Sequence, residues 1–348
     1  MVPLSSGAKK GLLAGGAVLV LAGGAFAMLA ARDEGGLPLI GGEPVTCPLT
    51  GLEPANEARV ERPAVAVKIE NSVAARPLSG LEDAEVVFEE LVEGGVTRFM
   101  ALYHCTDARK AGPVRSARVV DPSIMVPLTR ILAFSGANQP VKEALADAGV
   151  VTIDESSADD AVFRVDRPGV SSEHTLYAST PKLRRIGARS YDEPPPDDVF
   201  SFGESPVKGR RARTVTVVFS AASTVVWQWS DGSWLRFEGS DPAMAESGEQ
   251  LVATNVLIEE HDVDLSDDIV DSAGNPSVEI SDVTGSGRAV LFRDGRAIAG
   301  RWVREELEGP VRFETRSGEE MVFAPGTLWI ELVPSDRGEV KGSFSYER

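Results

Sequence analysis

The sequence has few of the residues from which metal and nucleophilic sites are usually built. It contains two cysteines and three histidines among 348 residues, too few for the cysteine- and histidine-rich sets that hold soft metals. No complete catalytic signature occurs either. We therefore expect no metal site and no cofactor, and the sequence does not assign any catalytic residue.

Positive charge is also scarce. The chain has 35 lysines and arginines against 53 acidic residues, a formal net charge of −18. This excludes a nucleic-acid-binding protein, which needs a basic surface to displace counterions from phosphates. The 43% hydrophobic and 25% charged residues are typical of globular proteins and exclude disordered and multi-span membrane classes.

The N-terminus carries a long run without charge. Residues 11–31 (GLLAGGAVLVLAGGAFAMLAA) follow a basic flank at 1–10 that contains Lys9 and Lys10. As a helix the run would extend about 31 Å, enough to cross a hydrocarbon core of about 30 Å. Because the basic flank stays in the cytoplasm, we expect the rest of the chain outside it. The run is either a retained single-pass anchor in the cell membrane or a signal peptide with a cleavage site at Ala25-Phe26-Ala27, which would make the protein secreted.

Export affects the interpretation of the two cysteines. In an oxidising compartment Cys47 and Cys105 are expected to form a disulfide. Cys47 lies about 16 residues beyond the apolar run, too far from it for the lipid-modified cysteine of a lipoprotein. Residues 32–46, with four glycines and two prolines, are typical of a flexible stalk.

Residues 47–190 alternate between strand-like and helix-like stretches. Strands are expected at 64–69, 84–93, 97–104, 130–135 and 150–154, with helices from Ser116 into 119–129 and at 141–148. Gly149 follows the second helix, as glycine often does at a helix end. The alternation predicts an α/β domain with a mixed sheet.

The second half has a different pattern. Residues 191–213 contain four prolines and are expected to be a linker or a wrapping segment. Strand-like runs then recur every eight to twelve residues over 214–334, and Asp231-Gly232 and Asp294-Gly295 predict hairpin turns between them. We expect a mostly antiparallel β domain over 214–334 and a tail at 335–348.

Several stretches resemble the YerB-like family of bacterial surface lipoproteins, whose function is unresolved. They are CPLTGL (47–52), RPAVAVKIENSVAARP (62–77), VEGGVTRFMALY (92–103), GPVRSAR (112–118), EHTLYASTPKL (173–183), GEQLVATNVLI (248–258) and GTLWIELVP (326–334). The resemblance implies an extracytoplasmic protein with an α/β N-terminal part and a mostly β C-terminal part. Family members commonly carry a lipid-modified cysteine, whereas this chain has the apolar run 11–31.

Four arginines in turn-like stretches of the first half form the candidate ligand-binding site. They are Arg76, Arg98, Arg115 and Arg118. Ser116 lies between the last two, and a helix beginning there would add free backbone N–H groups. Guanidinium groups beside a helix N-terminus suit a phosphate or a carboxylate. The alternative is that the arginines form internal ion pairs with acidic residues such as Glu70, Glu89, Glu90 and Glu93.

Other residues complete the candidate set. Glu89, Glu90 and Glu93 could include a general acid–base pair, although salt-bridged carboxylates are commoner. His174 lies in a family-like stretch next to Tyr177 and could line the pocket or serve as a hydrogen-bonding residue. Asn71 lies in the family-like stretch that also contains Arg76.

Two functions from different classes remain. The first is a non-catalytic, membrane-tethered envelope protein that binds an anionic component, such as a wall polymer or a lipid-linked precursor, or another envelope protein, through the arginine-lined cleft. The alternative is an enzyme that acts on a phosphate-linked cell-wall glycan or lipid-linked precursor, an analogy of location and charge rather than of motif. The absence of a metal spacing or a nucleophile motif favours the first.

Overall fold

A computed structural model describes residues 44–270 and 274–348. The basic flank 1–10, the apolar run 11–31 and most of the stalk lie outside the described residues. Within 44–270 and 274–348 there is no helix with the length and apolar character needed to cross a membrane.

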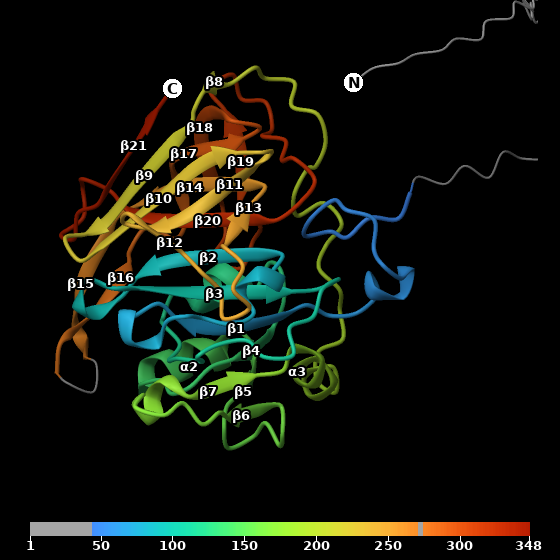
Figure 1. The fold of residues 1–348 in the computed structure, drawn as a ribbon, viewed down its shortest axis with the longest axis vertical. Helices are drawn as coiled ribbons and strands as arrows, with labels where there is room; N and C mark the ends of the chain where they lie inside the picture. The colour runs from blue at the N-terminus through green and yellow to red at the C-terminus, as the bar shows by residue number, and fades with distance from the viewer. Residues whose placement is uncertain (1–43, 271–273) are drawn as a thin grey trace, which may run out of the picture. The chain divides into compact units, whose positions relative to one another are not determined.

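An eleven-stranded mixed sheet forms the centre of the molecule, in the order β19-β18-β17-β14-β20-β2-β3-β1-β4-β5, with β8 paired to β18 (Figure 1). Its strands are β1 (Val65–Glu70), β2 (Val86–Leu91), β3 (Thr97–Tyr103), β4 (Ile131–Ala133), β5 (Val151–Ile153), β8 (Arg210–Arg211), β14 (Asn255–His261), β17 (Gly285–Arg293), β18 (Arg296–Arg304), β19 (Arg312–Thr315) and β20 (Leu328–Pro334). β20 runs parallel to both β2 and β14. Strands from 47–190 and from 214–334 therefore belong to one sheet, and residues 44–348 form one compact unit.

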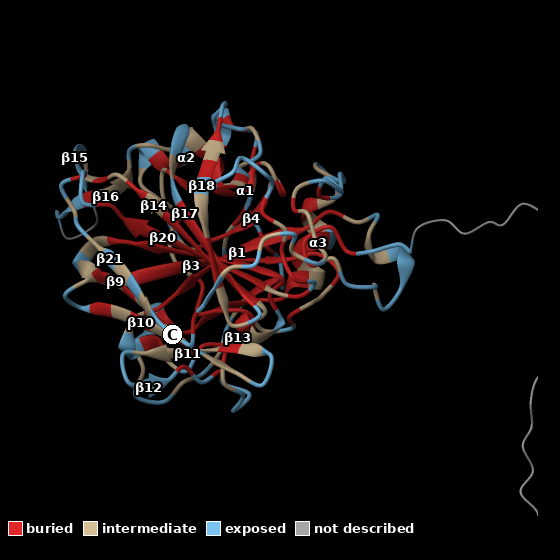
Figure 2. Cartoon of the chain, turned by 90° about the horizontal axis from the view of Figure 1, so that it is seen from above, coloured by how far each residue is buried: buried red, intermediate tan, exposed pale blue. Residues whose placement is uncertain are grey.

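A second, antiparallel sheet covers part of one face of the first. It comprises β9 (Thr214–Ser220), β10 (Ser223–Ser230), β11 (Ser233–Glu238), β12 (Asp241–Pro242), β13 (Val252–Ala253) and β21 (Ser343–Glu347). The two sheets are joined by aromatic side chains, with Trp227 against Trp329 at 5.2 Å between ring centroids and Trp234 against Phe292 at 5.8 Å. Figure 2 shows that the buried residues follow the central strands, and the exposed ones the periphery.

Helices are short and few. The described residues contain α1 (Asp121–Met125), α2 (Gln139–Asp147) and α3 (Thr180–Gly187), with single 3-10 turns at Glu57–Arg59, Val73–Ala75, Leu81–Asp83, Glu93–Gly95 and Ser172–His174. Two small hairpin sheets pair β15 (Val263–Val270) with β16 (Pro276–Ile280), and β6 (Val162–Arg164) with β7 (Leu176–Ala178). Among these elements α1 and α2 pack on the face opposite the second sheet.

The mixed sheet and the antiparallel sheets are as predicted, but the α/β prediction for 47–190 is wrong. The chain between β1, β2 and β3 is made of turns, and these three strands pair antiparallel. The helix expected from Ser116 begins only at Asp121. It is also short, because Pro127 has no N–H with which to continue it. The fold is therefore mostly β.

The two hairpin turns predicted from the sequence are confirmed. Asp231 and Gly232 have φ values of 49° and 89°, and Asp294 and Gly295 have 52° and 65°. These positive values are those that tight β-hairpins require, and the two turns join β10 to β11 and β17 to β18 as predicted. The expected tail instead contributes β21, which pairs with β9.

His261, at the end of β14, joins this strand to the loop after β16. Its Nδ1 lies 3.0 Å from Asp282 Oδ1 and its Nε2 lies 3.2 Å from Glu259 Oε2. Burial disfavours the charged imidazole, but the hydrogen bonds to the two carboxylates outweigh it and raise the pKa of His261 to about 9.

This shift predicts a specific pH dependence of stability. A histidine whose pKa is higher in the folded than in the unfolded protein stabilises the fold when it is protonated. This contribution is complete below the unfolded-state pKa of about 6.5 and is lost as the pH rises to the folded-state pKa, here over about pH 6.5–9. The difference in unfolding free energy between the wild type and His261→Gln should therefore be largest near pH 6 and shrink by up to about 3 kcal/mol by pH 9.5. Denaturant unfolding at a series of pH values measures it, and a difference that does not change with pH would contradict the assignment.

Candidate functional site

A solvent-open hollow lies where β1 ends and β3 begins, on the face of the central sheet that carries α1. Its volume is about 890 Å³, and its lining includes Glu70, Glu93, Arg98, Arg115, Ser116, Arg118, Glu173 and His174. The stretch 113–118 reaches the hollow because it runs beside β1, with the Arg115 backbone N–H donating to Lys68 O at 3.0 Å. Three of the four predicted arginines thus share one hollow.

Arg98 is the most buried of the three and lacks an acidic partner. The residue is 7% exposed, and its Nη1 donates to the Ser116 carbonyl oxygen at 2.9 Å. Its Nε is buried without a hydrogen-bond partner, and no carboxylate of the described residues lies within ion-pair distance of it. Burial, followed by repulsion from Arg118, lowers the pKa of Arg98 to about 10. The Arg98 guanidinium is therefore a buried cation with no carboxylate in direct contact.

Arg115 and Arg118 already contact acidic residues. Arg115 Nε is 3.5 Å from Glu70 Oε1, and its Nη1 donates to Glu173 Oε2 at 3.3 Å. Arg118 Nη2 donates to Glu93. Arg115 and Arg118 therefore form the internal ion pairs that were the alternative to ligand binding.

His174 is buried and lines the same hollow in a defined orientation. Its Nδ1 is 2.8 Å from Glu70 Oε2, while its Nε2 is 3.6 Å from Glu173 Oε1. Glu70 also accepts a hydrogen bond from Ser72 Oγ at 2.9 Å. The carboxylate of Glu70 therefore connects the histidine to Arg115.

Three other candidate ligand-binding residues, Arg76, Asn71 and Tyr177, lie outside the hollow. Arg76 pairs with Glu238 at 3.0 Å and donates to Asn71, whose own Nδ2 donates to Thr97 Oγ1 at 2.8 Å. Tyr177 is buried, with Lys110 Nζ 4.4 Å from its ring centroid. Arg76, Asn71 and Tyr177 do not line the hollow.

The alternation of strand side chains separates Glu89 from the hollow. Neighbouring residues of a strand point to opposite faces of a sheet. Glu89 faces the second sheet and lies 2.8 Å from Arg236 Nη1, while Glu90 faces the α1 side and lies 2.5 Å from Lys68 Nζ. Lys68 also donates to Asp121 Oδ1 at 2.8 Å. Glu89 and Glu90 are thus held by buried cations on opposite faces of the sheet, and of the three candidate carboxylates only Glu93 lines the hollow.

Sequence reasoning did not single out Lys68, Arg236 or Glu173. The signal for the first two was present, because a charged residue inside a run as apolar as AVAVKI (64–69) or WLRF (234–237) needs a buried partner. Glu173 carries no comparable signal, since it is an exposed acid in a turn.

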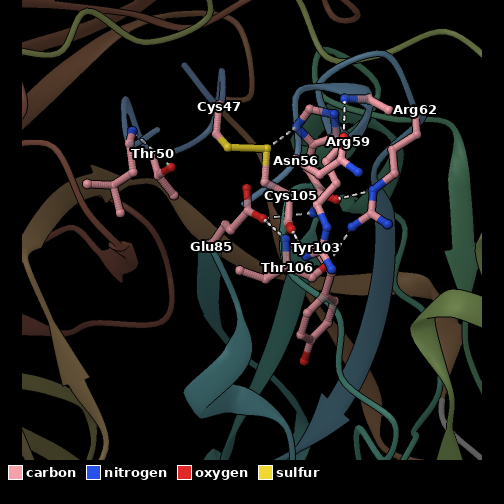
Figure 3. Close-up of a disulfide and its surroundings, with 12 residues drawn as sticks. Cys47, Thr50, Asn56, Arg59, Arg62, Glu85, Tyr103, Cys105 and Thr106 are labelled. Atoms are coloured by element: carbon pink, nitrogen blue, oxygen red, sulfur yellow. Dashed lines mark hydrogen bonds between the residues drawn. A yellow bond between two sulfur atoms is a disulfide. The ribbon is translucent and has the colours of Figure 1, made fainter. Parts of the chain in front are cut away.

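The predicted disulfide between Cys47 and Cys105 is present and joins the N-terminal segment to the end of β3 (Figure 3). Glu85 and His104 lie beside it, and one potential ligand atom from each of Glu85, His104 and Cys105 falls within 4.8 Å of the others. The Cys105 sulfur is bonded to Cys47, so it is not available as a thiolate ligand. This cluster is not a metal site while the bridge is intact.

The comparisons with known proteins agree with the resemblance in the sequence. Residues 49–192 match the family model described as "Protein of unknown function (DUF3048) N-terminal domain", and residues 215–330 match its C-terminal domain. The curated protein "Putative lipoprotein YerB" of Bacillus subtilis is 27% identical over 296 residues, which cover 82% of this chain and 86% of that protein.

A solved structure supports the fold. The crystal structure of the YerB protein from Bacillus subtilis matches with a TM-score of 0.70 and 24% identity, covering 86% of this chain and 99% of that one. Sequence motifs, both family models and the fold agree over most of the chain. The chain belongs to the YerB-like family, whose two parts are the N-terminal and C-terminal DUF3048 domains.

Proposed function

We propose that this protein is a membrane-anchored, extracytoplasmic binding protein of the bacterial envelope that takes an anionic group in the hollow around Arg98. The observation that carries the proposal is the buried Arg98 guanidinium, which has no carboxylate of the described residues within ion-pair distance. A buried cation is costly unless it is paired, so a site that keeps one beside open solvent favours an anion. The lipoprotein name of the curated relative and the apolar run 11–31 support the location.

The charges of the hollow limit the ligand. Its three arginines face three carboxylates, from Glu70, Glu93 and Glu173, so a large polyanion would meet repulsion. A single phosphate or carboxylate group, such as one unit of a wall polymer or the head of a lipid-linked precursor, fits this balance better. Arg115 and Glu173 are partly exposed, 28% and 52% for their side chains, so Arg115 can turn to a ligand.

Titration of the full chain with inorganic phosphate, pyrophosphate and glycerol phosphate tests the proposal. Loss of a charge-assisted hydrogen bond to a buried group costs about 1.5–3 kcal/mol. Arg98→Gln should therefore weaken binding about ten- to a hundredfold, and Arg115→Ala should weaken it less. Calorimetry measures the affinity, and thermal unfolding establishes that each variant is folded.

Arg301→Ala is the matched control. Arg301 is exposed on β18, pairs with Glu314 at 2.7 Å and does not line the hollow. We expect its substitution to leave the affinity unchanged. If none of the three anions binds, or if Arg301→Ala weakens binding as much as Arg98→Gln does, the hollow is not an anion site.

One observation favours the alternative of an enzyme acting on phosphate-linked glycans. Glu70 holds His174 through Nδ1, an arrangement that orients the other ring nitrogen as a general base does. The enzyme alternative predicts that the wild type releases phosphate from a sugar pyrophosphate. It also predicts that His174→Gln loses this release while it still binds anions. Both results together would show that the protein is an enzyme rather than a binding protein. Binding without turnover would support the binding protein.

A further inference from the structure

A second cavity, separate from the hollow, runs along the α1 side of the central sheet. Its floor is formed by Phe88, Ile330 and Leu332, and α1 with the residues after it forms one wall, including Ile124 and Leu128. The interior is narrow, about 40 Å³, and none of its lining residues lines the hollow. We call it the apolar cleft.

The apolar cleft shares lining residues with two wider grooves. It shares Val120, Ile280 and Val283 with a groove of about 370 Å³. It also shares Phe200 and Phe313, among others, with a groove of about 730 Å³. Its narrow interior would hold only about three waters. Apart from Glu259, His261 and Arg304 its lining is apolar and offers these waters few hydrogen bonds. The narrow part suits the width of a hydrocarbon chain, and the rest of such a chain would lie in the adjoining grooves.

A buried arginine lies in the wall of the cleft. Arg304, the last residue of β18, is 7% exposed, and its Nε has no hydrogen-bond partner. Across residues 44–270 and 274–348 it forms no ion pair. Burial lowers the pKa of Arg304, and Glu259 is the acid that opposes this shift.

The nearby acidic groups are already engaged by another cation. Glu259 and Asp282 both bind the ring of His261, at 3.2 Å and 3.0 Å, and Arg337 also contacts Asp282 at 3.3 Å. His261 is itself cationic at neutral pH. The Arg304 guanidinium therefore has no carboxylate of the described residues within ion-pair distance, and it lies next to an apolar channel. This arrangement is complementary to a ligand that is anionic at one end and apolar along its length.

We infer that the apolar cleft binds a single-chain anionic amphiphile of the fatty-acid class, with its carboxylate on Arg304 and its chain over Phe88 and Ile330. The inference is independent of the anion hollow. Each methylene buried in such a cleft strengthens binding about fourfold, so the affinity should increase from octanoate through decanoate to dodecanoate.

Quenching of tryptophan fluorescence by a bromine-substituted dodecanoate tests the inference in the full chain. Trp302 lines the apolar cleft and stacks on His261 at 4.6 Å between centroids, so a brominated chain in the cleft should quench it saturably. Trp302→Phe should remove that quenching. Unlabelled dodecanoate should restore the fluorescence by competition, and octanoate should do so only at far higher concentration.

Arg304→Gln should weaken dodecanoate binding at least tenfold. Its matched control is Arg301→Gln, three residues earlier on the same strand, exposed and paired with Glu314, which should bind as the wild type does. Because Arg304 is buried and its replacement could disturb folding, Val283→Trp provides a second variant. This change fills the half-buried mouth of the cleft, leaves Arg304 in place, and should also weaken binding at least tenfold.

Two further measurements distinguish the apolar cleft from the anion hollow and from non-selective adsorption of detergents. Arg98→Gln should leave dodecanoate binding unchanged, so failure of the hollow and failure of the cleft are distinguishable. Equal binding of dodecyltrimethylammonium or dodecyl maltoside would show that Arg304 does not select charge and would overturn the inference. Absence of saturable quenching, or quenching that Trp302→Phe does not reduce, would overturn it as well.

Discussion

Replacing Arg236 with methionine is expected to lower the free energy of unfolding by about 3–5 kcal/mol, because it leaves buried carboxylates without their cation. Arg236 is fully buried between the two sheets. Its guanidinium lies 2.8 Å from Glu89, 2.9 Å from Glu238 and 3.4 Å from Glu331.

Aromatic rings surround the same guanidinium. It lies 4.8 Å from the ring centroid of Trp329, 5.2 Å from Phe99 and 5.4 Å from Trp227. A desolvated cation gains attraction from ring faces at such distances. Methionine keeps much of the side-chain volume, so the loss should report charge rather than a cavity.

Glu331→Gln is the control for this cluster. Burial, together with the negative charge of Glu89, raises the pKa of Glu331 well above its usual range and favours its neutral form, which glutamine resembles in shape and charge. Its Oε1 accepts a hydrogen bond from Trp227 Nε1 at 2.7 Å, which an amide oxygen can also accept. We expect this variant to lose less than about 1 kcal/mol.

Urea unfolding of the two variants shows whether the loss of stability comes from the lost charge or from altered packing. A large loss for Arg236→Met with a small loss for Glu331→Gln supports a cluster in which the Arg236 cation holds Glu89 and Glu238. An Arg236→Met variant as stable as the wild type would contradict it.

Removing the disulfide is the second change with a large expected effect. Cys47 and Cys105 are 58 residues apart, and a loop of that length corresponds to about 4 kcal/mol in the chain-entropy account of disulfide stabilisation. The bridge holds the segment that buries Leu49 and Thr50. Cys47→Ser/Cys105→Ser should lose about this amount, together with the protection of residues 47–52 from amide exchange.

Reductant supplies the internal control for that experiment. Dithiothreitol should destabilise the wild type to the level of the double-serine variant and should not change the variant. If the wild type keeps its full stability after complete reduction, the bridge does not contribute as stated.

Short-range patterns predicted most strands, because period-two burial and tight turns are local properties. Asp231-Gly232 and Asp294-Gly295 specify their hairpins within a few residues. The parallel pairing of β2 with β20 joins Val86 to Leu328, and no local pattern encodes a partner at that distance. For the same reason the single central sheet could not be inferred from a chain whose two halves have different patterns.

The candidate site was predicted in part. Arg115, Ser116 and Arg118 share one short stretch, so their common location follows from the sequence, and Arg98 joins them through the pairing of β3 with β1. Arg76 follows a turn and lies on the side of the second sheet, where it pairs with Glu238. Glu89 and Glu90 are neighbours on one strand, so their side chains point to opposite faces of the central sheet. Which face such residues occupy depends on tertiary pairing rather than on residue type.

The most direct test of the account follows the Arg98 Nε–H resonance in the ¹⁵N-labelled protein, assigned by its loss in Arg98→Gln, during titration with inorganic pyrophosphate. The account predicts a saturable shift of this resonance, larger than that of the exposed Arg301 and unaffected by Arg304→Gln. An Arg98 resonance that stays in place while exposed arginines shift would contradict the claim that this buried cation receives an anion.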